Sequence, residues 1–491
     1  MIIVGFGKNN HDDSVCAYLD GEIKYAKYER EINRKSAVAP NWWFYEKIKS
    51  WGVKLKEVSL FVETDRGAHY LNLPRLPLHD IDVLETPHLK TIILDHHRAH
   101  LFSNPNYILN ETPGMVIDGM GSGRNRCLID DCFLPLKLKN LNPGNIYNEI
   151  GKVMELDDID PDNHEKYNDQ QGPAGKVMGL INYGKINFKL LNYIFKTEAK
   201  ELIDNTIKNN YHGKNDQNWQ DFIKTLDEYC YKIIQNKFSY LNKFKDKKII
   251  YSGGVALNVE WNRRLKKEGY LLDIDPAVND SGLSVGLVNF GLSKYNIKVP
   301  KIKNFPYIED DEAPLKNPSD ETINKVADLL SQNKIVGWYQ GHGEYGPRAL
   351  GNRSILMNPC MENGKDFINQ KVKNREWWRP FGASIKEERS SDYFDIKYSP
   401  YMLFSSKVLK KVIPAVTHVD NTCRHQTVNI NQNYYFYKLL DAFENKTKIP
   451  ILLNTSLNEG GKPICSTIEQ AKKVLKKTKL DYLCVGDTIY E

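Results

Sequence analysis

The same pattern occurs twice in this chain of 491 residues. It consists of a strand, a loop of small or polar residues and a second strand. The first copy is MIIVGFGKNNHDDSVCAYLDGEIKYAKYER at 1–30, where a turn at Asp20-Gly21 leads on to a third strand. The second copy is PGMVIDGMGSGRNRCLIDDCFLP at 113–136. This repeat predicts an internal duplication that gives two similar lobes. Strand, turn and helix follow one another at 247–269, which places the chain in the α/β class.

The length of the chain exceeds what one hydrophobic core supports, so we expect at least two domains. Residues 301–320 are polar, contain three prolines and show no periodicity, and we interpret them as a linker. Residues 321–340 then read as an amphipathic helix that leads into a strand. We therefore expect one domain over 1–310 and a second over 320–491.

Composition excludes several classes of protein. The chain has no run of 18 or more apolar residues and no signal-peptide pattern at its start, which predicts a cytoplasmic protein without a membrane segment. Its eight cysteines are scattered without a C-x-x-C pair, so we expect reduced thiols and neither a structural zinc site nor a disulfide framework. Residues 320–491 hold 25 basic and 19 acidic side chains, whereas 1–319 hold 43 of each. This bias favours a small phosphate-bearing ligand, although the lysines of a helix at 471–479 account for much of it.

Two histidines indicate a metal site. His96 and His100 lie four residues apart in a helical stretch, so both rings project from one face, while His97 points elsewhere. Asp118 ends an apolar strand and Asp280 lies in a turn, and either could add a carboxylate. Imidazole and carboxylate together suit iron, manganese or zinc better than calcium. A satisfied structural pair of histidines is the alternative.

Three loops carry further candidates. His11 stands beside two aspartates and is either a solvated residue or a general base near neutral pH. In GGVALN (253–258), the amides of Gly253 and Gly254 and a following helix N-terminus could bind phosphate, although the P-loop lysine is missing. Lys176, in GKVMGLINYG (175–184), is either a phosphate ligand or part of a packing turn.

The stretch EYGPRALGNRSIL (344–356) combines two arginines with two glycines and a proline. Arg348 and Arg353 each offer a planar fork of donors suited to phosphate or carboxylate oxygens. The stretch is therefore either an anion site or a surface turn with ordinary salt bridges.

In chain order, these segments resemble the ATP-dependent O-carbamoyltransferases typified by the nodulation-factor, tobramycin and cephamycin enzymes. The resemblance covers nearly the whole chain and rests on GKNNHDD, HHRAH, VIDGMGSG, GKVMGLINYG, SGGVALN, PAVNDSGLSVG, EYGPRALGNRSIL, KVKNREWWRPFGAS, HVDNTCRHQTV and NTSLNEGGKPIC. The last four motifs are the most specific.

This resemblance implies a fold and a reaction. The implied fold is α/β, with a duplicated actin/sugar-kinase/Hsp70-like N-terminal domain and a YrdC-like α/β C-terminal domain. The implied enzyme is an ATP-dependent O-carbamoyltransferase. Its C-terminal domain forms carbamoyl-adenylate from carbamoyl phosphate and ATP, and its N-terminal domain passes the carbamoyl group to an acceptor hydroxyl.

The resemblance also implies roles for individual residues. His11 maps onto the general base, and Arg348 and Arg353 onto catalytic cations. The implied metal ligands, for iron first and for manganese or zinc next, are His96, His100, Asp118 and Asp280. The implied contacts to substrates and to ATP with magnesium are Lys176, Gly253, Gly254, Asn258, Lys373, Arg375, Arg379, Arg424, Asn454 and Ser456.

Two rival functions fit the sequence less well. A sugar kinase on the same fold would not need the C-terminal arginine motifs, and a scaffold without turnover would not need His11, the histidine pair and all the arginines. For the acceptor, we expect first a small hydroxyl-bearing molecule such as a sugar or natural product. A 5-hydroxymethylpyrimidine (hydroxymethylcytosine) nucleotide or nucleic acid is the alternative. A homodimer is one option for the assembly.

Overall fold

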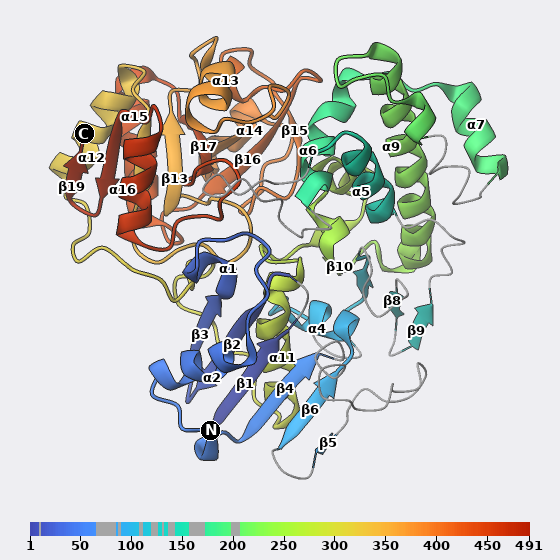
Figure 1. The fold of residues 1–491 in the computed structure, drawn as a ribbon, viewed down its shortest axis with the longest axis vertical. Helices are drawn as coiled ribbons and strands as arrows, with labels where there is room; N and C mark the ends of the chain where they lie inside the picture. Colours follow the sequence, from blue (N-terminus) through green and yellow to red (C-terminus); the bar gives the residue numbers. More distant parts are fainter. Residues whose placement is uncertain are drawn as a thin grey trace. The chain divides into compact units, whose positions relative to one another are not determined.

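The computed structural model describes residues 1–8, 11–64, 85–86, 90–107, 111–118, 126–129, 132–135, 143–156, 172–197 and 207–491. Contacts among these residues divide the chain into two compact units, whose elements are labelled in Figure 1. The first unit comprises Met1–Ile146, Cys230–Leu257 and Arg264–Lys303. The second comprises Tyr147–Tyr229, Asn258–Arg263 and Asn304–Glu491.

The first sheet of the first unit has the strand order β3-β2-β1-β4-β6-β5. Its strands are β1 (Ile2–Gly7), β2 (Ser14–Leu19), β3 (Glu22–Lys27), β4 (Leu60–Thr64), β5 (Glu85–Thr86) and β6 (Thr91–Leu94). β1, β2 and β3 form an antiparallel meander, as the hairpin signals predicted. β4 and β6 then continue parallel to β1.

The second sheet of this unit has the strand order β11-β10-β7-β8-β9. Its strands are β7 (Gly114–Val116), β8 (Arg126–Ile129), β9 (Cys132–Pro135), β10 (Lys248–Ser252) and β11 (Leu271–Asp273). Again an antiparallel meander of three strands is extended by two parallel strands. Both sheets thus share one topology, which confirms the predicted duplication.

Helices cover both faces of the first sheet. One face packs against α2 (Asn41–Ser50) through a core that includes Phe6, Val15 and Phe44. The other face packs against α11 (Leu283–Lys294), whose residues 283–292 are all buried. The remaining elements here are α1 (Tyr28–Glu31), η1 (Leu55–Glu57), α4 (His96–Phe102), η4 (Ser239–Phe244), η5 (Gly254–Leu257) and η6 (Asp280–Gly282).

The central part of the chain is helical. Its elements are α5 (Pro143–Val153), α6 (Gly172–Leu180), η3 (Ile181–Tyr183), α7 (Phe188–Thr197), α9 (Gln217–Phe238) and α10 (Val259–Lys267). The buried carboxylate of Asp227 accepts hydrogen bonds from Tyr147 and from the indole of Trp261. These bonds join three separate segments of the second unit.

The C-terminal part of the second unit contains an eight-stranded sheet with the order β15-β16-β14-β17-β13-β12-β18-β19. Its strands are β12 (Val336–Tyr339), β13 (Arg353–Met357), β14 (Gly382–Lys386), β15 (Ser406–Lys407), β16 (Thr422–Val428), β17 (Ile451–Ser456), β18 (Tyr482–Val485) and β19 (Thr488–Tyr490). The associated helices are α12 (Asp320–Ser331), α13 (Gly364–Phe367), η7 (Ile368–Val372), η8 (Glu387–Arg389), α14 (Ser390–Tyr393), η9 (Pro414–Val416), α15 (Tyr434–Thr447) and α16 (Ile468–Lys477).

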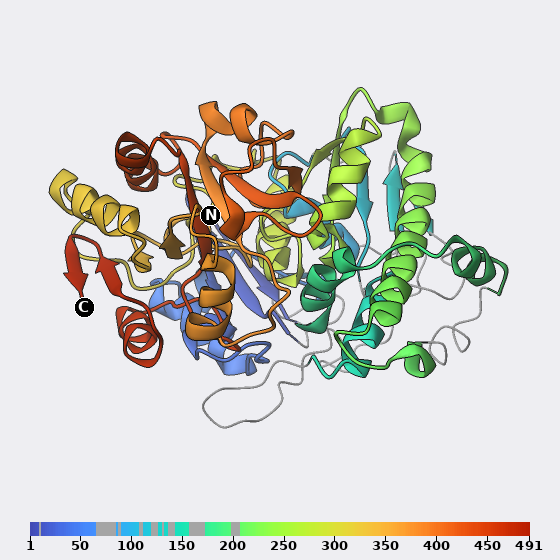
Figure 2. The same cartoon turned by 90° about the horizontal axis from the view of Figure 1, so that it is seen from above.

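Alternate residues of these strands enter two different cores. Trp338 and Leu356 pack with α12 and α15, whereas Tyr339 and Ile355 pack with α14 and α16. Figure 2 shows helices on both faces of this sheet. This alternation is expected of a sheet that is covered on both faces. The α/β class is therefore confirmed, while the YrdC-like character of this part stays a prediction.

The structure corrects the interpretation of 301–320 as a linker. Glu312 donates its amide to Ser466, and Ser319 caps α12 while it also contacts Asp487. Asp311 forms a buried ion pair with Arg353. Prolines and a lack of periodicity are also expected of an extended segment that is bound along the second unit. The polar groups of this segment, which we call the strap, find partners there. Residues 147–229 also cluster with the C-terminal part, so the units do not follow the predicted domain boundary throughout.

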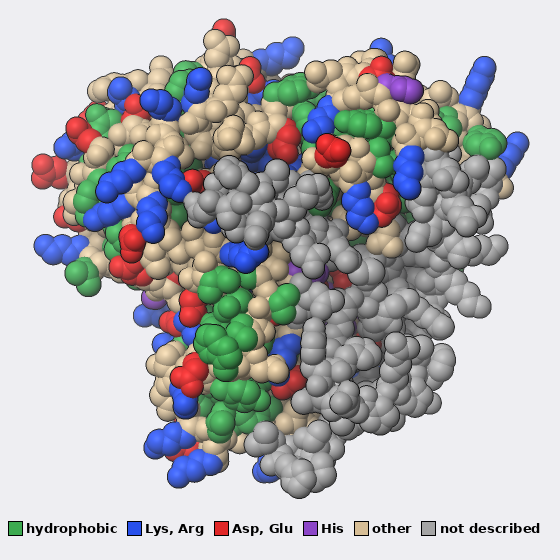
Figure 3. All heavy atoms as spheres, viewed as in Figure 1, with side chains coloured by type: hydrophobic (Ala, Val, Ile, Leu, Met, Phe, Trp, Pro, Cys, Tyr) green, Lys and Arg blue, Asp and Glu red, His purple; other side chains and the backbone are tan. Residues whose placement is uncertain are grey.

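Basic side chains gather over α16 in Figure 3. Ala471 and Val474 of this helix are buried, whereas its lysines face outward, as the amphipathic pattern predicted. Much of the C-terminal basic excess is therefore a solvated helix face. The six cysteines whose side chains are described are free. No helix among the described residues is long and apolar enough to span a membrane.

Candidate active sites

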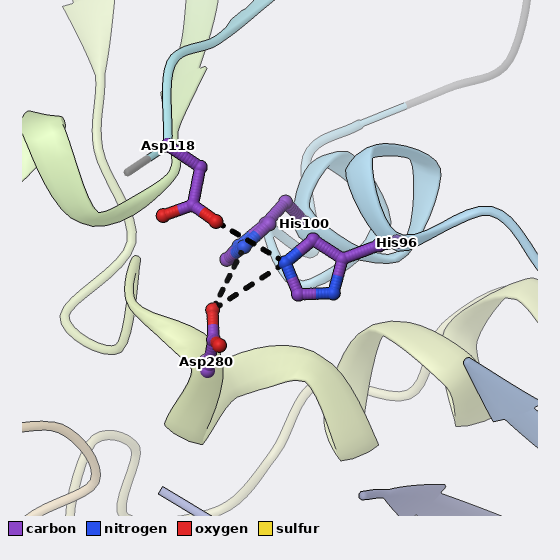
Figure 4. Close-up of side chains that lie close together, drawn as sticks. All are labelled: His96, His100, Asp118 and Asp280. Carbon is purple, nitrogen blue, oxygen red and sulfur yellow. Dashed lines mark hydrogen bonds and ion pairs between the residues drawn. The ribbon is translucent and has the colours of Figure 1, made fainter. Parts of the chain in front are cut away.

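The first unit brings the four predicted metal ligands together, as Figure 4 shows. His96 Nε2 lies 3.3 Å from Asp118 Oδ2 and 3.5 Å from Asp280 Oδ1. His100 Nε2 lies 3.3 Å from the same Asp280 oxygen. One ligand atom from each residue fits within 4.8 Å of the others, and all four side chains are buried. His97, although buried beside them, is outside this group.

These distances fit a small divalent metal ion. Ligand atoms about 2.1 Å from a tetrahedral ion stand roughly 3.4 Å from one another, which matches the three contacts between histidine and aspartate. Both ring nitrogens of His100 are buried, and among the described residues the Asp280 carboxylate is the group close to Nε2, while Nδ1 makes no hydrogen bond. Two imidazoles and two carboxylates are the donor set that iron, manganese or zinc accepts.

The charges of the four side chains depend strongly on one another. Burial alone lowers the pKa of His96, but the carboxylates of Asp280 and Asp118 outweigh it and raise that pKa to about 10. Burial raises the pKa of Asp118, yet the two imidazoles hold it below its usual range. The two carboxylates thus favour positive charge between them, which is the charge that a divalent metal ion would bring.

Close helix packing places the ligands. A Cβ atom at Gly286 of α11 would lie 2.0 Å from the carbonyl oxygen of Ala99 in α4. Only glycine permits this approach, which brings the start of α11, and with it Asp280, onto the helix that carries the histidines. Asp95 begins α4 by accepting hydrogen bonds from the amides of His97 and Arg98.

The glycine turn after β10 supports neighbouring elements. Gly253 adopts φ +92°, and its amide donates to the carbonyl of Val278. The Gly254 amide donates to Asp118 Oδ1 at 3.1 Å. Asn258 Oδ1 accepts bonds from the amides that begin α10. These groups thus hold Asp118 and the start of α10, and their predicted contact with phosphate stays a prediction.

His11 lies at the edge of the metal cluster. Its Nε2 stands 3.7 Å from Asp280 Oδ2, and its Nδ1 lies 3.0 Å from Asp12 Oδ2. The ring is 8% exposed. The structure therefore places the predicted base next to the predicted metal ligands.

The second unit brings four arginines close enough to influence one another's charge. They are Arg348, Arg375, Arg379 and Arg424. Burial, and then the charges of Arg424 and Arg379, hold the pKa of Arg348 well below its usual range. Burial lowers the pKa of Arg424 to about 10. Among the described residues, neither Arg348 nor Arg424 has a carboxylate partner, so an anionic ligand could supply the opposite charge at these two arginines.

Arg353 differs from Arg348 in its surroundings, and its predicted catalytic role stays a prediction. Its fully buried guanidinium donates to the carbonyls of residues 340, 341, 312 and 352 and pairs with Asp311 at 2.8 Å. It also lies over the Tyr339 ring, 3.6 Å from the centroid. With every contact made to protein, Arg353 closes the base of the loop that carries Arg348.

Further polar groups hold this loop from inside. Glu344 Oε1 accepts the amides of Leu350, Asn352 and Arg353. The predicted ligand Asn454 instead donates to the carbonyl of Ala349. These bonds fix the loop conformation and leave Arg348 as its outward cation.

Lys373 and Ser456 are also engaged within the protein. Lys373 Nζ contacts the carbonyl and hydroxyl oxygens of Ser456 and the carbonyl of Asn458. Lys373 is 2% exposed and supports this turn, and the predicted ligand roles of Lys373 and Ser456 stay predictions.

Glu376 links the predicted ligand Lys176 to the arginines. Lys176 Nζ bonds to the carbonyl of Leu156 at 2.8 Å and lies 3.5 Å from Glu376 Oε1. Glu376 also contacts Arg379 at 3.4 Å. The carbonyl of Lys176 accepts from the Trp378 indole, so α6 packs directly on the arginine-rich segment.

Sequence reasoning missed several supporting residues. Glu344 and Glu376 lie inside the arginine motifs. Their closeness in sequence to the arginines could have identified them as supporting residues. Asp311 and Lys27 lie in segments that carried no motif, and only the fold brings them to their partners.

Comparison with known proteins identifies the family. A family model described as carbamoyltransferase N-terminus matches residues 23–288, and one described as carbamoyltransferase C-terminus matches 327–491. Nodulation protein NolO of Bradyrhizobium diazoefficiens is 33% identical over 296 residues, which are 55% of this chain and 54% of that protein. Nodulation protein U of Rhizobium tropici is 36% identical over 225 residues, which are 43% of this chain and 38% of that protein.

Full-length HypF in its phosphate- and nucleotide-bound form is a structural neighbour with a TM-score of 0.36 and 16% identity, covering 59% of this chain and 55% of that one. The chain spans about half the length of the curated relatives that it matches first. The two family models together cover most of the chain in the order that the motifs predicted. The chain therefore belongs to the carbamoyltransferase family.

Proposed function

We propose that this protein is an O-carbamoyltransferase that uses carbamoyl phosphate and ATP. In the proposed reaction, carbamoyl phosphate and water give carbamate and phosphate. Carbamate then attacks the α-phosphorus of ATP, so that carbamoyl-adenylate forms and pyrophosphate leaves. An acceptor hydroxyl finally attacks the carbamoyl carbon, which yields the carbamate ester and AMP.

The arginine cluster carries this proposal. Carbamoyl phosphate and the ATP triphosphate are both polyanions, and Arg348 and Arg424 are partly buried cations without a carboxylate partner among the described residues. Fixed cations in such a place stabilise the charge that builds up as pyrophosphate leaves. We assign adenylate formation to this site, with magnesium accompanying ATP.

The metal cluster and His11 support the transfer step. A divalent transition metal, iron first and manganese or zinc next, would be held by His96, His100, Asp118 and Asp280. When bound, it would supply a Lewis acid for phosphate and carbonyl oxygens. His11 would accept the proton of the acceptor hydroxyl, because an alcohol is a poor nucleophile until a positioned group takes that proton.

Exchange of pyrophosphate into ATP, dependent on carbamoyl phosphate, tests the first step. Arg348→Met should lower this exchange by about 100-fold, because a charge-assisted bidentate contact to phosphate contributes on the order of 2 to 3 kcal/mol. Arg389→Met is the matched control, since Arg389 pairs with Asp392 and Glu444 at the surface. Exchange at the wild-type rate in Arg348→Met would refute the assignment of the site.

The acceptor is proposed to be a small hydroxyl-bearing molecule such as a sugar or natural product. The equal numbers of acidic and basic residues in 1–319 favour a small molecule over a polynucleotide, which needs a positive surface. A 5-hydroxymethylpyrimidine nucleotide or nucleic acid is the second candidate. Incubation with carbamoyl phosphate, ATP and a panel of sugars, alcohols and hydroxymethylcytidine, followed by mass spectrometry for the carbamoyl gain, discriminates between them.

A further inference from the structure

We propose that Asp12 is a positioning residue that fixes the proton of His11 on Nδ1, so that Nε2 is the basic nitrogen facing the metal cluster. This inference rests on the proposed role of His11 in carbamoyl transfer and adds a residue to that site.

Asp12 receives hydrogen bonds from three directions. Its Oδ2 lies 3.0 Å from His11 Nδ1 and accepts from Asn279 Nδ2 at 3.1 Å. Its Oδ1 lies 2.5 Å from the ammonium group of Lys27. An ionised carboxylate can only accept hydrogen bonds, so each of these three neighbours acts as a donor.

That geometry determines the tautomer of the ring. If Nδ1 lacked a proton, its lone pair would face the Asp12 oxygen at 3.0 Å, and two acceptors would repel each other. With the proton on Nδ1, the neutral ring keeps its lone pair on Nε2. This nitrogen stands 3.7 Å from Asp280 Oδ2, beyond a hydrogen bond, on the side of the metal ligands.

Lys27 keeps Asp12 in the accepting state. Lys27 is 4% exposed and contacts both Asp12 and Glu29. The distance from Lys27 Nζ to Glu29 Oε1 is 2.8 Å. Although burial raises the pKa of Asp12, Lys27 and then His11 hold that pKa well below its usual range. A buried cation behind the carboxylate therefore maintains the anion that orients the ring.

The backbone at Asp12 is also unusual. Asp12 adopts φ +58°, a left-handed conformation that costs energy for most residues and is best tolerated by asparagine, aspartate and glycine. This turn directs the Asp12 side chain back onto the preceding histidine. Asparagine preserves the backbone preference, so Asp12→Asn changes the hydrogen-bonding chemistry with little strain.

The neighbouring Asp13 provides a matched control. Asp13 is 2% exposed, and its Oδ2 accepts the amide of Ala39 at 2.7 Å. Asp13→Asn therefore alters a buried carboxylate in the same loop, and this carboxylate contacts Ala39, whereas that of Asp12 contacts the His11 ring. An effect restricted to Asp12→Asn separates orientation of His11 from general damage to the loop.

The tautomer can be measured directly. Protein with ¹⁵N-labelled histidine rings and zinc in place of any paramagnetic ion gives long-range ¹H–¹⁵N spectra, in which His11→Gln assigns the ring by loss of its signals. The wild type and Asp13→Asn should show the proton of His11 on Nδ1. Asp12→Asn should show Nε2–H, or a mixture of the two tautomers, because its amide can donate to Nδ1.

Transfer is measured in parallel from preformed carbamoyl-adenylate to glycerol. Asp12→Asn should lower the maximal rate by about 100-fold to 10,000-fold, leave the glycerol concentration for half-maximal rate unchanged, and leave pyrophosphate exchange intact. A wild-type ring protonated on Nε2, or an unchanged spectrum in Asp12→Asn, would overturn the inference. A tautomer change without a change in transfer would instead refute the proposed role of His11 and retain the assignment of Asp12 as its orienting group.

Discussion

Arg348 and Arg353 lie in one motif, but only the replacement of Arg353 by methionine is expected to lower stability. Arg353 makes all its contacts to protein, and Asp311, its ionic partner, is 2% exposed. Removal of one partner of a buried pair costs about 3 to 5 kcal/mol, because the remaining charge stays buried without compensation. At roughly 2 to 4 °C per kcal/mol, the apparent melting temperature of Arg353→Met should fall by on the order of 10 °C.

Arg348→Met should leave that melting temperature unchanged or raise it. Burial and the charges of Arg424 and Arg379 already hold the pKa of Arg348 well below its usual range, so its charge is unfavourable in the protein without ligand. Methionine removes that charge and keeps much of the side-chain length. The two variants should therefore separate cleanly in differential scanning calorimetry at low ionic strength, without nucleotide.

Calorimetry of a double variant isolates the pair itself. If the ion pair causes the loss, Asp311→Asn combined with Arg353→Met should destabilise by less than the sum of the single variants. The loss of one weak contact shifts the melting temperature by roughly 2 °C. If Arg353→Met melts within that range of the wild type, the structural role of Arg353 is refuted. A fall in Arg348→Met of the same size as that expected for Arg353→Met would refute it as well.

Three further outcomes are expected. Gly286→Ala should destabilise the first unit and lower its metal content, because a Cβ there meets the α4 backbone at 2.0 Å. His96→Ala with His100→Ala should abolish binding of iron or zinc in elemental analysis, whereas His97→Ala should retain it. Burial lowers the pKa of His425 from 6.5 to about 3, so the stability from its neutral ring is complete above pH 6.5 and is lost as the pH falls towards 3. His425→Phe should therefore flatten the acid slope, by at most about 1.4 kcal/mol per pH unit.

Each of these outcomes has a clear contrary result. Normal metal content in Gly286→Ala would show that the two helices can separate without loss of the cluster. Full occupancy in the double histidine variant would make the histidines structural. An acid slope in urea unfolding that is the same with and without His425 would assign the acid sensitivity to other groups.

Local sequence patterns predicted much of the fold and of the metal cluster. The two strand meanders, the helix at His96 and the amphipathic α12 each depend on residues close together in the chain, and all are present. His96 and His100 could be paired because helical spacing puts them on one face. The two aspartates could only be placed at element ends, and tertiary packing of α4 on α11 then decided that Asp280 meets the histidines.

The sequence is least informative where a polar group could bind either a ligand or the protein. The glycines after β10 looked like a phosphate cradle, yet Asp118 accepts the Gly254 amide. The strap at 301–320 looked like a linker, because sequence does not reveal that its polar groups bind residues more than 150 positions away, such as Ser466. In both cases the partner came from a distant segment, which no local pattern contains.

The arginines show the same limit most sharply. Arg348 and Arg353 have identical chemistry and lie in one motif, so the sequence gives each the same capacity to hold phosphate. Their roles differ because Asp311 and the surrounding carbonyls satisfy Arg353, while other arginines surround Arg348. A cation satisfied by protein adds to stability, whereas a cation held among like charges lowers it until an anion binds. The second kind is therefore the one on which a phosphate-bearing substrate can act, and this difference in partners, not the motif itself, locates the anion site.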